Sequence, residues 1–130
     1  MSKMDEVRAL REDPNVHYNC AQAVLIPFAE ERGLDRKTAF ALAESFGGGM
    51  RVGATCGALT GALMALGLNG GSTAQTQKLI RRFREMHDGI SDCAMLLKRD
   101  REKGNTDRKA HCDRMVYDAV EALEEVLGEG

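Results

Sequence analysis

Residues 47–68 read GGGMRVGATCGALTGALMALGL, and the rest of the chain is best understood outward from this stretch. It holds seven of the fourteen glycines, and its only charge is Arg51. A glycine-rich loop here turns into an apolar helix, with Cys56 at the junction. Thr55 is a good N-cap, because its hydroxyl can accept from a free amide of the first turn. We therefore predict that Cys56 occupies the first helical position, where the helix dipole favours a thiolate.

Two glycines, Gly57 and Gly61, follow one turn apart inside the predicted helix. Each internal helical glycine costs roughly 1 kcal/mol relative to alanine, so a compensating close approach is expected. Packing of another helix against this face is the simpler explanation. A bound ligand is the other, and it would make Gly57, Gly61 and Arg51 cofactor-binding residues. The neighbouring helix could also come from a second copy of the chain, which makes a homodimer a candidate assembly.

Apolar residues recur at helical spacing along most of the chain. No convincing strand-like alternation is present. The pattern predicts an all-α protein, a single domain over residues 1–130 with about six or seven short helices packed as hairpins. The predicted helices lie near residues 2–12, 19–33, 35–46, 56–68, 72–88, 91–97 and 107–127.

Composition limits the classes of partner. A length of 130 residues suffices for one domain with a sizeable core. A net charge of −2 gives no reason to expect nucleic acid as a partner. The charged N-terminal segment is unlike a signal peptide, and the apolar stretch after Cys56 is too short and too glycine-rich for membrane insertion. We expect a cytoplasmic protein with an unidentified redox partner, since cysteines in that compartment more often serve redox or metal chemistry.

The cysteines are Cys20, Cys56, Cys93 and Cys112, and the first three each follow a candidate N-cap residue. The steps between those three are 36 and 37 residues, about one helix–turn–helix unit. Alternate helices of an up-and-down bundle begin at the same end. We therefore expect these thiols to gather there, with Cys112 facing the same pocket from inside the last helix. The competing interpretation is four small buried hydrophobes, which Cys112 fits best.

A metal site would have to be assembled from distant segments, because the sequence contains no CxxC motif. Four thiolates suit zinc or an iron–sulfur cluster. His17, His87 and His111 could add a ligand or lower a thiol pKa, although an ordinary surface or partly buried histidine is the commoner case. His111 and Cys112 are neighbours on a helix and point about 100° apart, which disfavours a shared ligand site.

Two charged features have an ordinary interpretation. Residues 98–109, KRDREKGNTDRK, carry nine charges in twelve positions, and we expect a solvated helix end and loop there rather than a binding tail. Arg51 could stabilise a thiolate or an anionic substrate, but a solvated loop charge is the simpler expectation.

The ordered cysteines resemble a family of small redox-active proteins named for a C…GCAxxG…C…C pattern. The core here is CGALTG at residues 56–61, with Cys-Gly where the family name has Gly-Cys. Cys20 lies upstream in YNCAQAVL, and Cys93 and Cys112 lie downstream. The resemblance covers about residues 15–120 and implies an all-helical protein with redox-active cysteines. The fold is also similar to the iron–sulfur-binding part of split-Soret cytochromes, which keeps a cluster among the candidate cofactors.

Three hypotheses of function follow. In the first, the chain is a thiol-dependent oxidoreductase or electron-transfer protein with Cys56 as the attacking thiolate and Cys20 or Cys93 as the resolving thiol. In the second, Cys20, Cys56, Cys93 and Cys112 are ligands of zinc or an iron–sulfur cluster. In the third, the chain is a non-catalytic interaction module whose small-residue helix mediates dimerisation.

Overall fold

The computed structural model describes residues 2–128, which form seven α-helices and no β-strand. This confirms the predicted all-α fold. None of the described helices combines the length and apolarity needed to cross a membrane. The helices are α1 (Lys3–Glu12), α2 (Cys20–Glu31), α3 (Arg36–Ala43), α4 (Gly57–Leu68), α5 (Thr73–Met86), α6 (Cys93–Glu102) and α7 (Arg108–Gly128). A 3₁₀ turn (Glu44–Phe46) and the glycine segment (Gly49–Gly53) connect α3 to α4.

The central helix α2 begins at a reciprocal cap that the sequence predicts. The amide of Gln22 donates to Asn19 Oδ1 at 2.8 Å, and the amide of Asn19 donates to Gln22 Oε1 at 2.9 Å. Such a capping box satisfies two amides that a helix start otherwise leaves free. It therefore fixes Cys20 as the first residue of α2.

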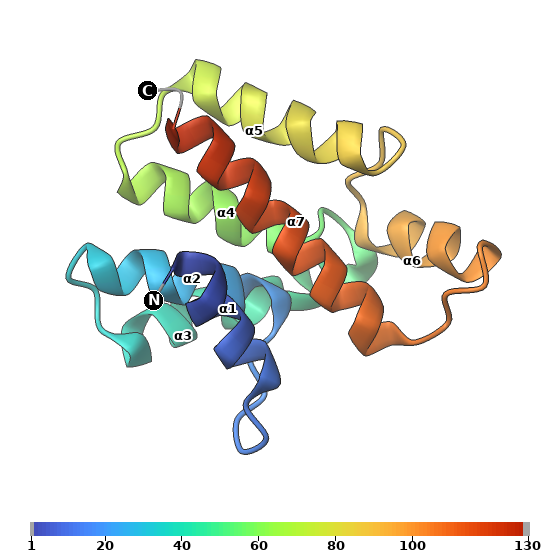
Figure 1. Cartoon of the computed structure of the whole chain (residues 1–130), viewed down its shortest axis with the longest axis horizontal. Coiled ribbons are helices and arrows are strands. Elements are labelled where there is room, and N and C mark those ends of the chain that lie inside the picture. Colours follow the sequence, from blue (N-terminus) through green and yellow to red (C-terminus); the bar gives the residue numbers. More distant parts are fainter. Residues whose placement is uncertain (1, 129–130) are drawn as a thin grey trace.

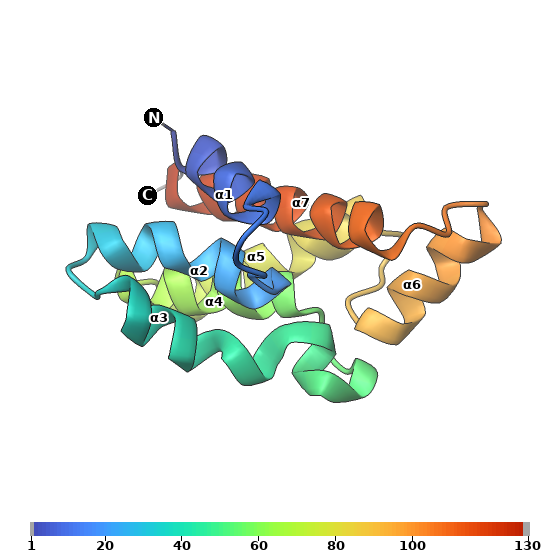
Figure 2. The ribbon, with the colours of Figure 1, turned by 90° about the horizontal axis from the view of Figure 1, so that it is seen from below.

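The other helices are arranged around α2, whose residues 20–29 are all buried. Figure 1 shows α4, α5 and α7 running alongside one another, with α1, α2 and α3 grouped beside them. Figure 2 shows α1 and α7 side by side on one face of the α2–α4 layer, with α3 on the opposite face. Helix α6 projects from one end of this bundle and contacts the glycine segment and α7.

The backbones of α2 and α4 approach each other so closely that glycine is required at the contact. A Cβ atom on Gly61 would lie 2.6 Å from the carbonyl oxygen of Ala21 and 3.2 Å from Val24 Cβ. Packing within the chain is thus the compensating reason for this helical glycine. The glycine–alanine face is covered by α2, so it is not available to a second copy of the chain.

We predict opposite effects of alanine at two glycines of α4. Gly61→Ala should lower the free energy of unfolding by about 1–3 kcal/mol, because the added methyl group overpacks the contact with α2. Gly67→Ala is the matched control, since a Cβ there meets nothing within 4 Å. It should raise stability by up to about 1 kcal/mol through helix propensity. Urea unfolding of both variants measures this, and equal effects would contradict the close contact.

Candidate functional site

All four cysteines line one cavity of about 650 Å³. Cys20 opens α2, Cys56 immediately precedes α4, Cys93 opens α6, and Cys112 lies near the start of α7. Figure 2 shows these helix starts close together, at the end of the bundle from which α6 projects. The clustering expected from the cysteine spacing is confirmed. The rest of the wall is formed by Arg11, the segment 13–19, Gly48 and the start of α7.

A short antiparallel bridge between Thr55 and Asp92 brings Cys56 and Cys93 together. The amide of Cys56 donates to the Ser91 carbonyl at 2.8 Å, and the amide of Cys93 donates to the Ala54 carbonyl at 2.7 Å. Cys56 directly follows Thr55 in the chain, and Cys93 directly follows Asp92. Because side chains alternate along extended backbone, both cysteines point to the face opposite Thr55 and Asp92. The bridge therefore directs two distant thiols into one cavity.

The predicted start of α4 is one residue too early. Cys56 is the N-cap residue, with φ −50° and ψ 128°, and the first helical residue is Gly57. Thr55 is not the cap, because its backbone is used in the bridge to Asp92. The local preference of threonine for the N-cap position is thus overridden by a pairing with a segment far along the chain.

The thiol of Cys20 packs directly against the start of α4. A Cβ on Gly57 would lie 2.5 Å from Cys20 Sγ and 2.6 Å from the Phe46 carbonyl oxygen. Only glycine leaves room for this thiol beside Cys56. The predicted cofactor-binding role of Gly57 and Gly61 has no support here, since neither lines the cavity and both are in close contact with α2.

The expectation that Cys56 has a depressed pKa is wrong. Its side chain is only 4% exposed, and burial, followed by the charge of Cys20, raises its pKa to about 12. The amides of Leu59 and Ala58 at the helix start favour the thiolate, as predicted, but they are outweighed. Loss of solvation penalises a buried thiolate more than one helix N-terminus can stabilise it.

Cys93 and Cys112 are partly exposed, and the charge of at least one arginine acts on each of them. Burial, then the charge of Cys20, raises the pKa of each. Arg108 opposes the shift at both thiols, and Arg11 also opposes it at Cys112. Cys20 is thus the one thiol whose charge raises the pKa of each of the other three.

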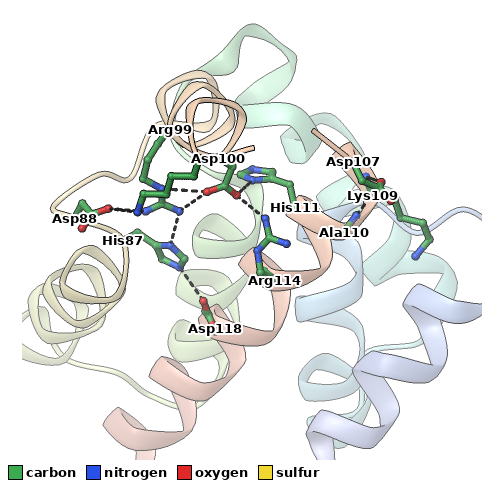
Figure 3. Close-up of polar contacts among 11 residues, drawn as sticks. His87, Asp88, Arg99, Asp100, Asp107, Lys109, Ala110, His111, Arg114 and Asp118 are labelled. Carbon is green, nitrogen blue, oxygen red and sulfur yellow. Dashed lines mark hydrogen bonds and ion pairs between the residues drawn. The ribbon is translucent and has the colours of Figure 1, made fainter. Parts of the chain in front are cut away.

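A buried polar network holds α6 against α7 beside the cavity (Figure 3). Asp100 Oδ2 lies 2.5 Å from His111 Nδ1 and accepts from Arg114 at 2.8 Å. Asp100 Oδ1 accepts from Arg99 at 2.9 Å. Burial alone would raise the pKa of Asp100, but the hydrogen bonds from His111, Arg114 and Arg99 hold it well below its usual range. The carboxylate is therefore charged, and its partners neutralise it.

The network continues to α5 through His87, as Figure 3 shows. Arg99 Nη2 lies 3.1 Å from His87 Nδ1. Arginine can only donate, so Nδ1 accepts and the ring hydrogen lies on Nε2. That atom is 3.0 Å from Asp118 Oδ2, within ion-pair distance but without the geometry of a hydrogen bond. Three helices are therefore joined by charged and polar groups, and this arrangement fixes Cys93 of α6 relative to Cys112 of α7.

Sequence reasoning missed much of this network. Residues 98–109 were expected to be solvated, yet Asp100 is only 4% exposed. Nothing in the local charge pattern distinguishes it from its neighbours. Arg108 also belongs to that segment and lines the cavity. Its position one turn before Cys112 is the signal that could have identified it.

Some of the other candidate site residues line the cysteine cavity, and others lie outside it. His111 and Cys112 line the same cavity despite their adjacent positions on α7, and the exposed His17 lies on its wall. His87 is buried in the polar network and does not line the cavity. Arg51 also lies outside it. Its guanidinium donates to the Glu44 carbonyl at 3.0 Å, and its side chain is exposed.

The residues described do not form a ready metal site. Across residues 2–128, no three side chains among His, Cys, Asp and Glu are positioned to hold one metal ion. The cysteines share a cavity, but they do not converge as a zinc or iron–sulfur site requires. The predicted zinc or cluster has no support in this arrangement.

The fold and cavity define an all-helical protein with a four-cysteine site. A family model described as "Putative redox-active protein (C_GCAxxG_C_C)" matches residues 18–126. The chain belongs to this family. Neither the curated proteins nor the solved structures contain a significant match to it.

We predict that the four thiols react with iodoacetamide in an order set by burial. At about pH 8, Cys93 and Cys112 should be alkylated first and Cys56 last, because only the exposed thiolate reacts. Mass spectrometry of peptides from timed samples measures the order. Protein unfolded in urea is the control, in which all four should react alike. Fastest alkylation at Cys56 would contradict the burial argument.

We predict that Asp100→Asn weakens the attachment of α6. It should lower the free energy of unfolding near neutral pH by about 3 kcal/mol, since it leaves the buried His111 and the partly buried Arg99 without their carboxylate partner. Asp88→Asn is the control, because Asp88 pairs with Arg99 at 3.5 Å but is 63% exposed. That variant should cost less than about 1 kcal/mol.

The effect of Asp100→Asn should also depend on pH. The folded-state pKa of Asp100 is lowered, so its contribution is full above the unfolded-state pKa of about 4 and is lost as the pH falls toward the folded-state pKa. Urea unfolding at a series of pH values should therefore show the gap between wild type and variant narrowing below about pH 4. A gap independent of pH would contradict the role of the carboxylate charge.

Proposed function

We propose that the protein is a thiol–disulfide redox protein in which the four cysteines act as one site. The observation that carries the proposal is that thiols from four separate segments line one cavity. All four are free thiols. Membership in the redox-active family supports the same reaction class.

The proposed roles follow exposure and charge. Cys112 is the outer thiol that meets the oxidant, because it is partly exposed and two arginines, Arg11 and Arg108, favour its thiolate. Cys93 is similarly exposed but has support from Arg108 alone. Cys20 is the resolving thiol, since it lines the same cavity as Cys112 and its charge raises the pKa of Cys112. A resolving thiol attacks from within the protein, so its burial is no obstacle.

The reaction balances with a disulfide as the oxidant. The Cys112 thiolate attacks one sulfur of the disulfide, forms a mixed disulfide and releases the first thiol, which takes the proton that Cys112 lost. The Cys20 thiolate then attacks the Cys112 sulfur and expels the second thiol, which takes the Cys20 proton. The protein loses two electrons and two protons, and the oxidant becomes two thiols. A reductant reverses both steps.

Cys56 has a different role in this proposal from the one expected from its helix. A thiol with a pKa of about 12 that is 4% exposed is a poor first nucleophile. Its proximity to Cys20, across Gly57, makes it an inner thiol that can exchange with a Cys20 disulfide. Cys56 thus remains in the redox site without meeting the oxidant directly.

We predict that Cys20→Ser traps the first intermediate. Reduced Cys20→Ser treated with a small disulfide should accumulate a mixed disulfide on Cys112, because the resolving thiol is absent. Intact-mass and peptide measurements detect the adduct.

Cys56→Ser is the matched control, since Cys56 is also buried. It should form an internal disulfide and retain no adduct. Equal adduct in both variants, or none in Cys20→Ser, would contradict the proposed role of Cys20.

A further inference from the structure

The wall of the cysteine cavity carries more positive than negative charge. Arg11, Arg108 and Lys109 line it, whereas Asp13 is the one acidic residue among its lining residues within 2–128. The Asp13 carboxylate is itself engaged, because its Oδ1 accepts from the amides of Asn15 and Val16 at 2.8 and 3.2 Å. An anion entering the cavity therefore meets a net positive surface.

Two of the three cations already have a carboxylate partner. Arg11 Nε lies 2.7 Å from Asp113 Oδ1, and Lys109 Nζ lies 3.0 Å from Asp113 Oδ2. Arg108 differs, because no carboxylate of residues 2–128 forms an ion pair with it. Its side chain is exposed. It is the cation of this wall that no carboxylate pairs with, and its side-chain hydrogen bond to Cys112 favours the thiolate there.

The position of Arg108 connects anion binding to the reacting thiols. It lies one turn before Cys112 on α7, and its Nη2 atom is 4.0 Å from where a Cβ on Gly48 would lie. The guanidinium thus reaches from α7 toward the glycine-rich loop. It influences the pKa of both Cys93 and Cys112. A group bound to Arg108 would therefore lie beside the two partly exposed thiols.

The size of the cavity selects for a small molecule. A volume of about 650 Å³ is typical of sites for small ligands. Cys112, which meets the oxidant, is only partly exposed and lies on the wall of this cavity, so a small molecule reaches its sulfur more readily than the surface of a folded protein does. Pro14, Val16 and Met115 add apolar surface to the wall, which suits the carbon skeleton of such a ligand.

We propose that the substrate is a small anionic disulfide whose carboxylate binds Arg108 while its sulfur faces Cys112. This rests on the proposed thiol–disulfide function and specifies its substrate class. A guanidinium matches a carboxylate with two parallel hydrogen bonds. That geometry fixes one end of the substrate and orients its disulfide toward the thiol.

The test compares disulfides that differ in charge. The fully reduced protein is mixed with dithiodipropionate, which is anionic, with bis-hydroxyethyl disulfide, which is neutral, and with cystamine, which is cationic. Each rate of thiol loss is divided by the rate of the same disulfide with dithiothreitol, which removes differences between leaving thiols. The normalised rate should be about fivefold higher for the anion than for the neutral disulfide and lowest for the cation. The preference should largely vanish in about 1 M salt.

Variants of Arg108 isolate the recognition step. Arg108→Gln should reduce the anion-to-neutral ratio to about one, while Arg108→Lys should retain part of it. Arg81→Gln is the matched control, because Arg81 is an exposed arginine on α5 that does not line this cavity. It should leave the ratio unchanged.

The outcomes separate this inference from the proposed function. Reaction with the neutral disulfide but no preference for the anion would overturn the role of Arg108 and leave the redox function standing. An anion preference that survives in Arg108→Gln would likewise overturn the role of Arg108 and leave the redox function standing. Failure of the reduced protein to react with any of the three disulfides would overturn both proposals.

Discussion

The close contact between α2 and α4 is the constraint on which the site depends. At Gly61 the α4 backbone approaches the Ala21 carbonyl so closely that a methyl group would collide with it. One turn earlier, the same contact brings the Cys20 thiol against Gly57, next to Cys56. Two glycines inside one helix are costly in isolation. Here they allow two thiols from separate helices to become neighbours in the core.

The other half of the site is held by polar interactions instead of close packing. Helix α6 projects from the bundle, and two attachments fix it: the bridge at Asp92 and the network around Asp100. Both act on the segment that carries Cys93. The four thiols therefore differ in environment, with an inner pair in a tightly packed core and an outer pair beside cations. This gradient of burial and charge is the basis of the distinct roles that we propose for the four cysteines.

Local sequence signals predicted the helices well, and they failed where distant segments meet. The cap at Asn19 is a local interaction, so it was predictable, and the regular cysteine spacing predicted the cluster because helix starts alternate between bundle ends. Thr55 has the preference of an N-cap, but its pairing with a distant segment decides its conformation. The amides beside Cys56 favour a thiolate as expected, yet tertiary burial dominates. Asp100 lies in a charge-rich run, and only the contact of α6 with α7 buries it.

The central claim is that the four cysteines form one redox site in which Cys20 resolves a disulfide begun at Cys112. The most direct measurement is peptide mapping, without reduction, of protein oxidised by one equivalent of a small disulfide. The account predicts one internal disulfide that joins Cys20 to Cys112, or to Cys56 after exchange, with two thiols left free. Four unchanged thiols, disulfides only between different molecules, or an internal disulfide that excludes Cys20 would contradict it.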